Sequence, residues 1–336
     1  MRFILVLSMA FGVLSSPLLA DEISPPRPDL DRFVVNNASV RQVARVLGFV
    51  AGQTAALNAV ARQHPHLAAR VEALQREFVV RYSFPSQRAR WFLDYALGEE
   101  VAAQQANRIL DQVQASVGEI DATRALMFLS EVEGRLDGQV SVEELKAMLW
   151  LAYPDDGDIE MRAWWEGFNS AGHPKAAGLE ITLRTPLSWE QMEGNRPHIV
   201  SKWTSQNGTG DVVVTLLVRM LPEVITYDDV REVARSGNWG WMIPEGFEFL
   251  NGAPVEIDRQ PGLQVDAIGE RRALDAVITQ RTRTYTLFPP NRLVQLGCAL
   301  GAAQGGDEAF LDRRFEAMRQ TCRQIAASIA FPDTYR

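Results

Sequence analysis

The spacing of apolar residues changes near residue 155, and this change constrains the fold more than any other feature of the chain. Before it, apolar side chains recur every three or four residues, as on the buried face of an α-helix. After it, they alternate with polar side chains, as in a strand with one buried face. The sequence therefore predicts an α+β chain, with an all-α domain over residues 39–170 and an antiparallel β-sheet domain with packed helices over residues 178–336.

Helical spacing predicts five segments in the first half. They span residues 39–63, 65–82, 85–117, 121–133 and 142–152. Gly98 interrupts the third segment. Ser39 is placed to cap the first helix, because a serine hydroxyl accepts a hydrogen bond from the free backbone amides of a helix start. No strand is predicted within residues 39–170.

Alternating apolar residues predict the strands of the second half. These strands span residues 179–183, 198–206, 211–221, 248–257, 263–272, 277–288 and 291–300, and a final helix spans 307–330. The tetrapeptide Asn207-Gly208-Thr209-Gly210 predicts a hairpin, because Asn and Gly tolerate positive φ. Thr226 and Asp229 form a capping pair for a short helix that runs to Ala234.

The start of the chain has the layout of a secretory signal peptide. Arg2 supplies a positive charge, an apolar stretch follows, and small residues lead to Ala20. Neither this stretch nor any later one reaches the ~20 uncharged apolar residues that a membrane helix needs. We therefore predict a signal peptide over residues 1–20, a Pro-rich linker over 21–38, no integral membrane segment after cleavage, and a periplasmic or secreted protein.

The two cysteines of the chain are predicted to face each other. Cys298 shares a strand face with Leu296 and Leu300, and Cys322 lies on the apolar stripe of the final helix. Disulfides persist in exported proteins, so a Cys298–Cys322 bond is the preferred interpretation. Two separate buried thiols are the alternative.

Three short segments of the second half resemble one family. They are Thr185-Pro186-Leu187-Ser188-Trp189, Asn251-Gly252-Ala253-Pro254 and Ser328-Ile329-Ala330-Phe331. Together with the order of the elements, they are similar to PsbP-like (Mog/PsbP/DcrB-type) domains. The resemblance implies an α/β sandwich that serves as a binding or accessory module without a shared catalytic centre. It also implies packing and turn roles for Trp189, Gly252 and Ile329.

One loop has the length of a calcium-binding EF-hand loop. Glu133, Asp137 and Glu144 stand at ligand positions, although Arg135 occupies a position where a carboxylate or amide belongs. The same residues also form a turn and a capping box that begins with Ser141, without any metal. A Ca²⁺-responsive module is therefore kept as an alternative function.

The sequence contains few residues suited to catalysis. His64-Pro65-His66 is interpreted as a surface turn, and the acidic run Asp155-Asp156-Gly157-Asp158 as a solvated loop. The chain contains none of the common hydrolase motifs built around serine or histidine. A cell-wall or sugar hydrolase that uses a carboxylate pair is the remaining enzymatic alternative, and no cofactor is predicted.

Tryptophans between residues 161 and 242 are the best candidates for contact with a partner. The candidates are Trp239, Trp241, Trp203 and Trp189, and the first two lie in a Gly-rich loop. The formal net charge of −8 makes nucleic acid an unsuitable partner. The sequence therefore predicts an exported, non-enzymatic binding or accessory protein of the bacterial envelope that engages a protein partner.

Overall fold

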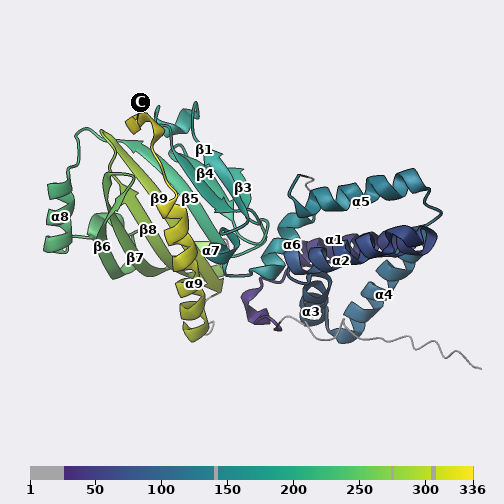
Figure 1. Ribbon diagram of the computed structural model, residues 1–336. Coiled ribbons are helices and arrows are strands. Elements are labelled where there is room, and N and C mark those ends of the chain that lie inside the picture. Colours follow the sequence, from purple (N-terminus) through teal and green to yellow (C-terminus); the bar gives the residue numbers. More distant parts are fainter. Residues whose placement is uncertain (1–25, 140–142, 274–275, 304–307, 336) are drawn as a thin grey trace, which may run out of the picture.

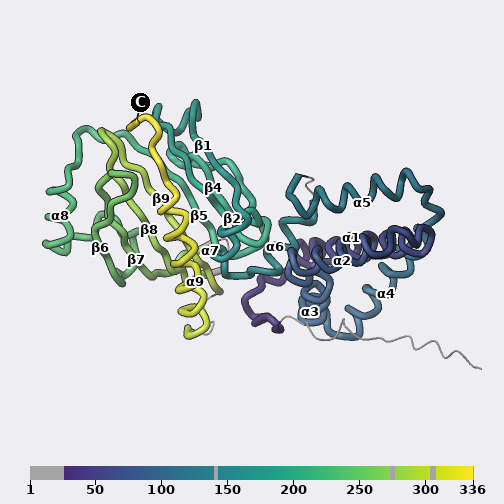
Figure 2. The backbone as a smooth tube through the Cα atoms, viewed as in Figure 1, coloured from purple at the N-terminus to yellow at the C-terminus, as the bar shows by residue number. Residues whose placement is uncertain are grey.

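The computed structural model describes residues 26–139, 143–273, 276–303 and 308–335. The predicted signal peptide lies outside the described residues and remains a prediction. A helical region and a sheet region lie side by side and are joined through helix α6 (Figures 1 and 2). The chain is therefore α+β, as predicted.

The helical region is a bundle around one apolar core. Its helices are α1 (Asn37–Gln63), α2 (Ala68–Arg81), α3 (Pro85–Leu97), α4 (Glu99–Ser116), α5 (Ala122–Leu136) and α6 (Leu145–Ala152). Gly98 separates α3 from α4 with φ at +81°, a backbone conformation that L side chains rarely adopt, and this confirms the predicted break. The N-cap of α1 is Asn36 instead of Ser39, and the Ser39 hydroxyl oxygen accepts a hydrogen bond from the Asn36 amide.

Helix α1 is long and apolar enough to cross a membrane, and it is the one such helix among the described residues. Its residues Val43, Val46 and Val60 are fully buried in the core of the bundle. A central helix of a water-soluble domain has the same length and composition, so α1 is weak evidence for a membrane span.

The linker predicted over residues 21–38 is in fact packed at its end. Phe33 is buried edge-on against Phe92 and Trp150, with ring centroids 5.5 Å and 5.7 Å away. The Gln206 side chain accepts a hydrogen bond from the Val34 amide and donates one to the Arg32 carbonyl. This segment therefore joins the helical core to the hairpin of the sheet region.

The sheet region contains a large sheet and a small one, both antiparallel. The strands are β1 (Trp165–Asn169), β2 (Thr182–Pro186), β3 (Glu190–Glu193), β4 (Ile199–Thr204), β5 (Val212–Met220), β6 (Phe247–Ile257), β7 (Gln260–Ala273), β8 (Ala276–Leu287) and β9 (Arg292–Ala303), with helices α7 (Gly157–Glu160), α8 (Tyr227–Ser236) and α9 (Glu308–Ala327). The large sheet has the order β3-β4-β5-β9-β8-β7-β6, and β1 pairs with β2 alone.

The first strands differ from the prediction. The expectation of no strand within residues 39–170 is wrong, because β1 lies there and pairs with β2. Strand β2 begins at Thr182 instead of residue 179, and β3 was not predicted. Strand β1 is only five residues long and has Gly167 at its centre, so its own strand propensity is low. Its pairing with β2 stabilises it as a strand.

Helix α9 covers one face of the large sheet, and a disulfide fastens it there (Figure 1). The Cys298 and Cys322 sulfurs are bonded across a sequence separation of 24 residues, which confirms the predicted pairing. On the opposite face, α8 and the loop after it cover β7 through a smaller cluster that includes Val230, Trp239 and Val265.

The acidic run after α6 is not the predicted solvated loop. The Asp155 side chain is 5% exposed and forms a two-pronged salt bridge with Arg314 of α9, with both nitrogen–oxygen distances at 3.0 Å. Arg314 also pairs with Asp211 at the start of β5. Burial raises the pKa of the Asp155 carboxyl above its ordinary value, against the opposing effect of Arg314. Asp155 therefore ties the inter-region connection to α9.

Candidate functional site

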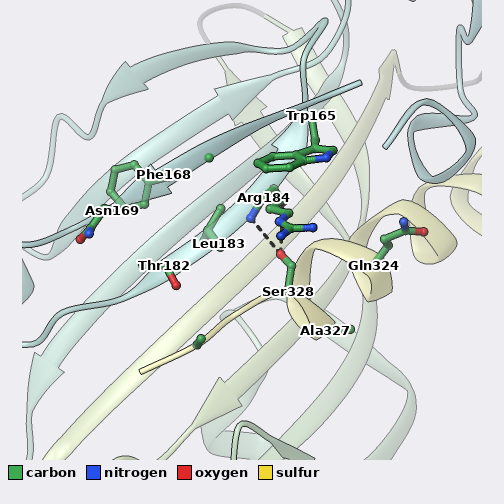
Figure 3. A pocket seen from close by; sticks show the side chains of 11 residues that line it. Trp165, Phe168, Asn169, Thr182, Leu183, Arg184, Gln324, Ala327 and Ser328 are labelled. Atoms are coloured by element: carbon green, nitrogen blue, oxygen red, sulfur yellow. Dashed lines mark hydrogen bonds between the residues drawn. The ribbon is translucent and has the colours of Figure 1, made fainter. Parts of the chain in front are cut away.

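A groove of about 730 Å³ lies between the small β1–β2 sheet and the end of α9 (Figure 3). This volume is in the range of small-molecule sites. The groove is lined by Trp165, Gly167, Phe168, Asn169, Thr182, Leu183, Arg184, Gln324, Ala327, Ser328 and Ala330. Its walls therefore come from segments that are more than 130 residues apart in the chain.

Strand alternation selects the side chains on the groove face. Trp165, Gly167 and Asn169 are the exposed positions of β1, and Arg184 is the exposed position of β2. The β1–β2 register sets Gly167 opposite Arg184. Gly167 has no side chain, and the Trp165 ring lies next to it: a Cβ at Gly167 would be 3.7 Å from the indole Cζ3.

Arg184 lies over the indole ring of Trp165, with its guanidinium carbon 4.0 Å from the ring centroid. Trp165 is 44% exposed, so this pair stands at the surface of the groove. No carboxylate lines the groove, and Arg184 is its one charged lining residue. Among the described residues Arg184 has no ion pair, so its positive charge is uncompensated locally.

The chain after α9 holds β2 in place. The Thr182 and Ala330 backbones exchange two hydrogen bonds, of 3.0 Å and 2.9 Å. The Arg184 amide donates to the Ser328 hydroxyl at 2.9 Å (Figure 3). Two of the three segments that resemble PsbP-like domains thus meet at β2: one begins within its last two residues, and the other lies beside it.

A buried carboxylate supports the turn after β2. Glu160 is fully buried, and its two oxygens accept hydrogen bonds of 2.7 Å from the Ser188 amide and the Ser188 hydroxyl. Burial raises the pKa of the Glu160 carboxyl to about 7, while the bonds from Ser188 act in the opposite direction. Through these two bonds, Glu160 positions the turn at Ser188.

We expect Glu160 to make the protein less stable as pH rises from about 4.5 to about 7. In this window the folded protein keeps a proton that the unfolded chain has released, so the free energy of unfolding falls with pH. In the Glu160→Gln variant, the side chain can still form hydrogen bonds with Ser188 but carries no negative charge. It should raise the free energy of unfolding at pH 8 by up to about 3 kcal/mol.

Urea unfolding at pH 5 and pH 8 measures this effect. Glu166→Gln is the matched control, because that carboxylate lies at the surface, 3.3 Å from Lys146. Glu166→Gln should keep the pH dependence of the wild-type protein. Equal pH dependence of Glu160→Gln and wild-type protein would contradict the assignment.

The predicted tryptophans fall into two groups. Trp241 is 51% exposed, and Trp239 is buried by stacking on Phe249 at 5.8 Å between ring centroids. Phe249 and Leu250 are 42% and 44% exposed. Leu250 occupies a β-bulge of the edge strand β6, which redirects the side chains there. We call Trp241, Phe249 and Leu250 the β6 surface.

The other two tryptophans lie in the core of the sheet region. Trp203 is 2% exposed and packs edge-on against Phe168, with ring centroids 5.3 Å apart. Trp189 is buried in the same cluster, in line with the packing role that the family resemblance implies. The structure thus brings neither of them to the β6 surface, and burial explains their role.

One predicted ligand of the EF-hand-like loop, Glu133, is engaged in a contact within the protein. Both Glu133 oxygens accept hydrogen bonds from Arg70, at 2.8 Å and 2.7 Å. Asp137 ends α5 and Glu144 precedes α6. Residues 140–142 of this loop lie outside the described residues. Within the described ranges, no group of three or more His, Cys, Asp or Glu side chains is placed to hold a metal ion.

The histidine pair lies at a helix junction. His64 ends α1, and its ring nitrogen Nε2 is 2.7 Å from the Ile120 carbonyl oxygen. The His66 ring stands edge-on to the His64 ring, with centroids 6.1 Å apart. The contact with Ile120 gives His64 a structural role between α1 and the chain before α5.

Comparison with known proteins finds similarity at the level of structure. No family model and no curated protein matches the chain. Cyanobacterial PsbP (CyanoP) from Synechocystis matches with 11% identity and a TM-score of 0.32, over 50% of this chain and 93% of that protein. LpqN from Mycobacterium tuberculosis, described as involved in cell envelope biogenesis, matches with 11% identity and a TM-score of 0.31, over 52% of this chain and 94% of that protein.

Proposed function

We propose that this chain is an exported, non-enzymatic accessory protein of the bacterial envelope that binds a protein partner through the β6 surface. The observation that carries the proposal is the exposure of Phe249 and Leu250 on the edge strand β6, together with that of Trp241 in the segment between α8 and β6. Large apolar side chains that gather at an exposed edge strand are typical of interaction sites.

The β6 surface also indicates the chemistry of the partner. Strand β6 is the last strand of the large sheet, so part of its backbone is free to pair with another strand. Exposed Glu245 and Glu248 flank the apolar residues. The partner that fits best is therefore an extended apolar segment with basic residues next to it.

We expect a photo-crosslinking amino acid at position 241 of the full chain to capture one discrete envelope protein in cells. Unlabelled wild-type protein should compete for this crosslink, and a variant with Trp241→Ser and Phe249→Ser should compete at least tenfold less well. The reason is that truncation removes the two largest exposed rings of the surface. The measurement is crosslink yield against competitor concentration.

Position 127 is the matched control. Met127 is 67% exposed on α5, far along the chain from β6, and should give no such product. The double variant must keep the melting temperature of the wild-type protein within a few degrees for the comparison to count. Equal yields from positions 241 and 127, or equal competition by both proteins, would refute the proposal.

A further inference from the structure

The lining of the groove beside β1 is positively charged, whereas the chain as a whole has a net negative charge. The chain carries 42 acidic and 34 basic residues, yet the lining of the groove includes one cation and no carboxylate. Arg184 has no ion pair among the described residues. An exposed cation held in a groove without a counter-charge attracts an anion, and a guanidinium suits a carboxylate because it can donate two parallel hydrogen bonds.

We propose that this groove binds an acidic saccharide, with the carboxylate of the sugar on Arg184 and a sugar ring beside Trp165. The site is distinct from the β6 surface, so this proposal does not depend on the proposed function.

The side chains around Arg184 match the other groups of such a ligand. The exposed Trp165 indole is a flat apolar surface for the C–H face of a ring. The Gln324 amide and the Thr182 hydroxyl have no side-chain hydrogen bond with a described residue, and both line the groove (Figure 3). They can therefore exchange hydrogen bonds with sugar hydroxyls.

The shape of the groove favours a saccharide over a peptide. Ala330 and Ser328 already bond the outer edge of β2, so a peptide cannot add to β2 as a further strand. A volume of about 730 Å³ suits a ligand of drug size, comparable to a short oligosaccharide.

Isothermal titration of the full chain with digalacturonate tests the proposal. We expect binding that weakens as salt is raised, because the contact with Arg184 is ionic. Arg184→Gln should weaken binding at least tenfold, and Trp165→Ala should also weaken it. Arg259→Gln is the matched control, because Arg259 is also an exposed arginine beside an aromatic ring, at 5.4 Å from Tyr335, and it should bind like the wild-type protein.

Three further probes separate the possible sources of affinity. Neutral digalactose should bind at least tenfold more weakly than digalacturonate, and inorganic phosphate and a tetraglutamate peptide should not compete. Equal binding of the neutral sugar, preferential binding of phosphate or tetraglutamate, or no binding of digalacturonate would each overturn the proposal. Crosslinking from position 241 would be unaffected by any of these results.

Discussion

Replacement of Arg314 by Met should lower the free energy of unfolding by about 3–5 kcal/mol, because it leaves buried carboxylates without their counter-charge. The Arg314 side chain is 7% exposed and holds both Asp155 and Asp211. In a protein of this size we expect the melting temperature to fall by roughly 10 °C. Thermal unfolding followed by circular dichroism measures the change.

Two comparisons test the cause of this loss. Arg313→Met removes an exposed arginine from the neighbouring position of α9 and should have little effect. The loss in Arg314→Met should shrink at low pH, because burial already raises the pKa of Asp155 and a proton can then neutralise it. An equal loss at pH 5 and pH 8 would show that packing, and not the unpaired charge, is responsible.

Removal of the Cys298–Cys322 disulfide should cost about 3 kcal/mol of stability. The bond closes a loop with a sequence separation of 24 residues and joins β9 to α9, so the unfolded chain gains freedom when it is absent. We expect a reducing agent to lower the melting temperature of the wild-type protein by several degrees.

The double variant Cys298→Ala with Cys322→Ala is the control for reduction. It should melt below the oxidised wild-type protein and show no response to the reducing agent. Both cysteines are almost fully buried, so part of the loss in the variant comes from smaller side chains. A wild-type protein that melts at the same temperature with and without reductant would contradict the stabilising role.

Local patterns were sufficient for much of the fold. Gly98 predicted the break between α3 and α4, and Asn207-Gly208 predicted the β4–β5 turn, where both residues have positive φ. Thr226 and Asp229 form the predicted capping box of α8. In each case the signal and the structure lie within a few residues of each other, so the sequence alone contains the information.

Features that depend on distant partners were missed. Strand β1 forms because it pairs with β2. The Asp155 side chain is buried against Arg314, which is 159 residues away in the chain. The groove was missed for the same reason, since Trp165 and Arg184 meet Gln324 only in the folded protein. Spacing along the chain gave no signal for any of these contacts.

The contact between the start of the helical region and the β4–β5 hairpin also has a consequence for the order of folding. Val34 bonds Gln206 across 172 residues, and Gln42 bonds the Asn207 carbonyl across 165. During synthesis from the N-terminus, more than half of the chain must therefore be made before the first helix can complete its contacts. Until then, the surface of the helical region that contacts the β4–β5 hairpin stays uncovered. This is the stage at which a holding chaperone would be of most use.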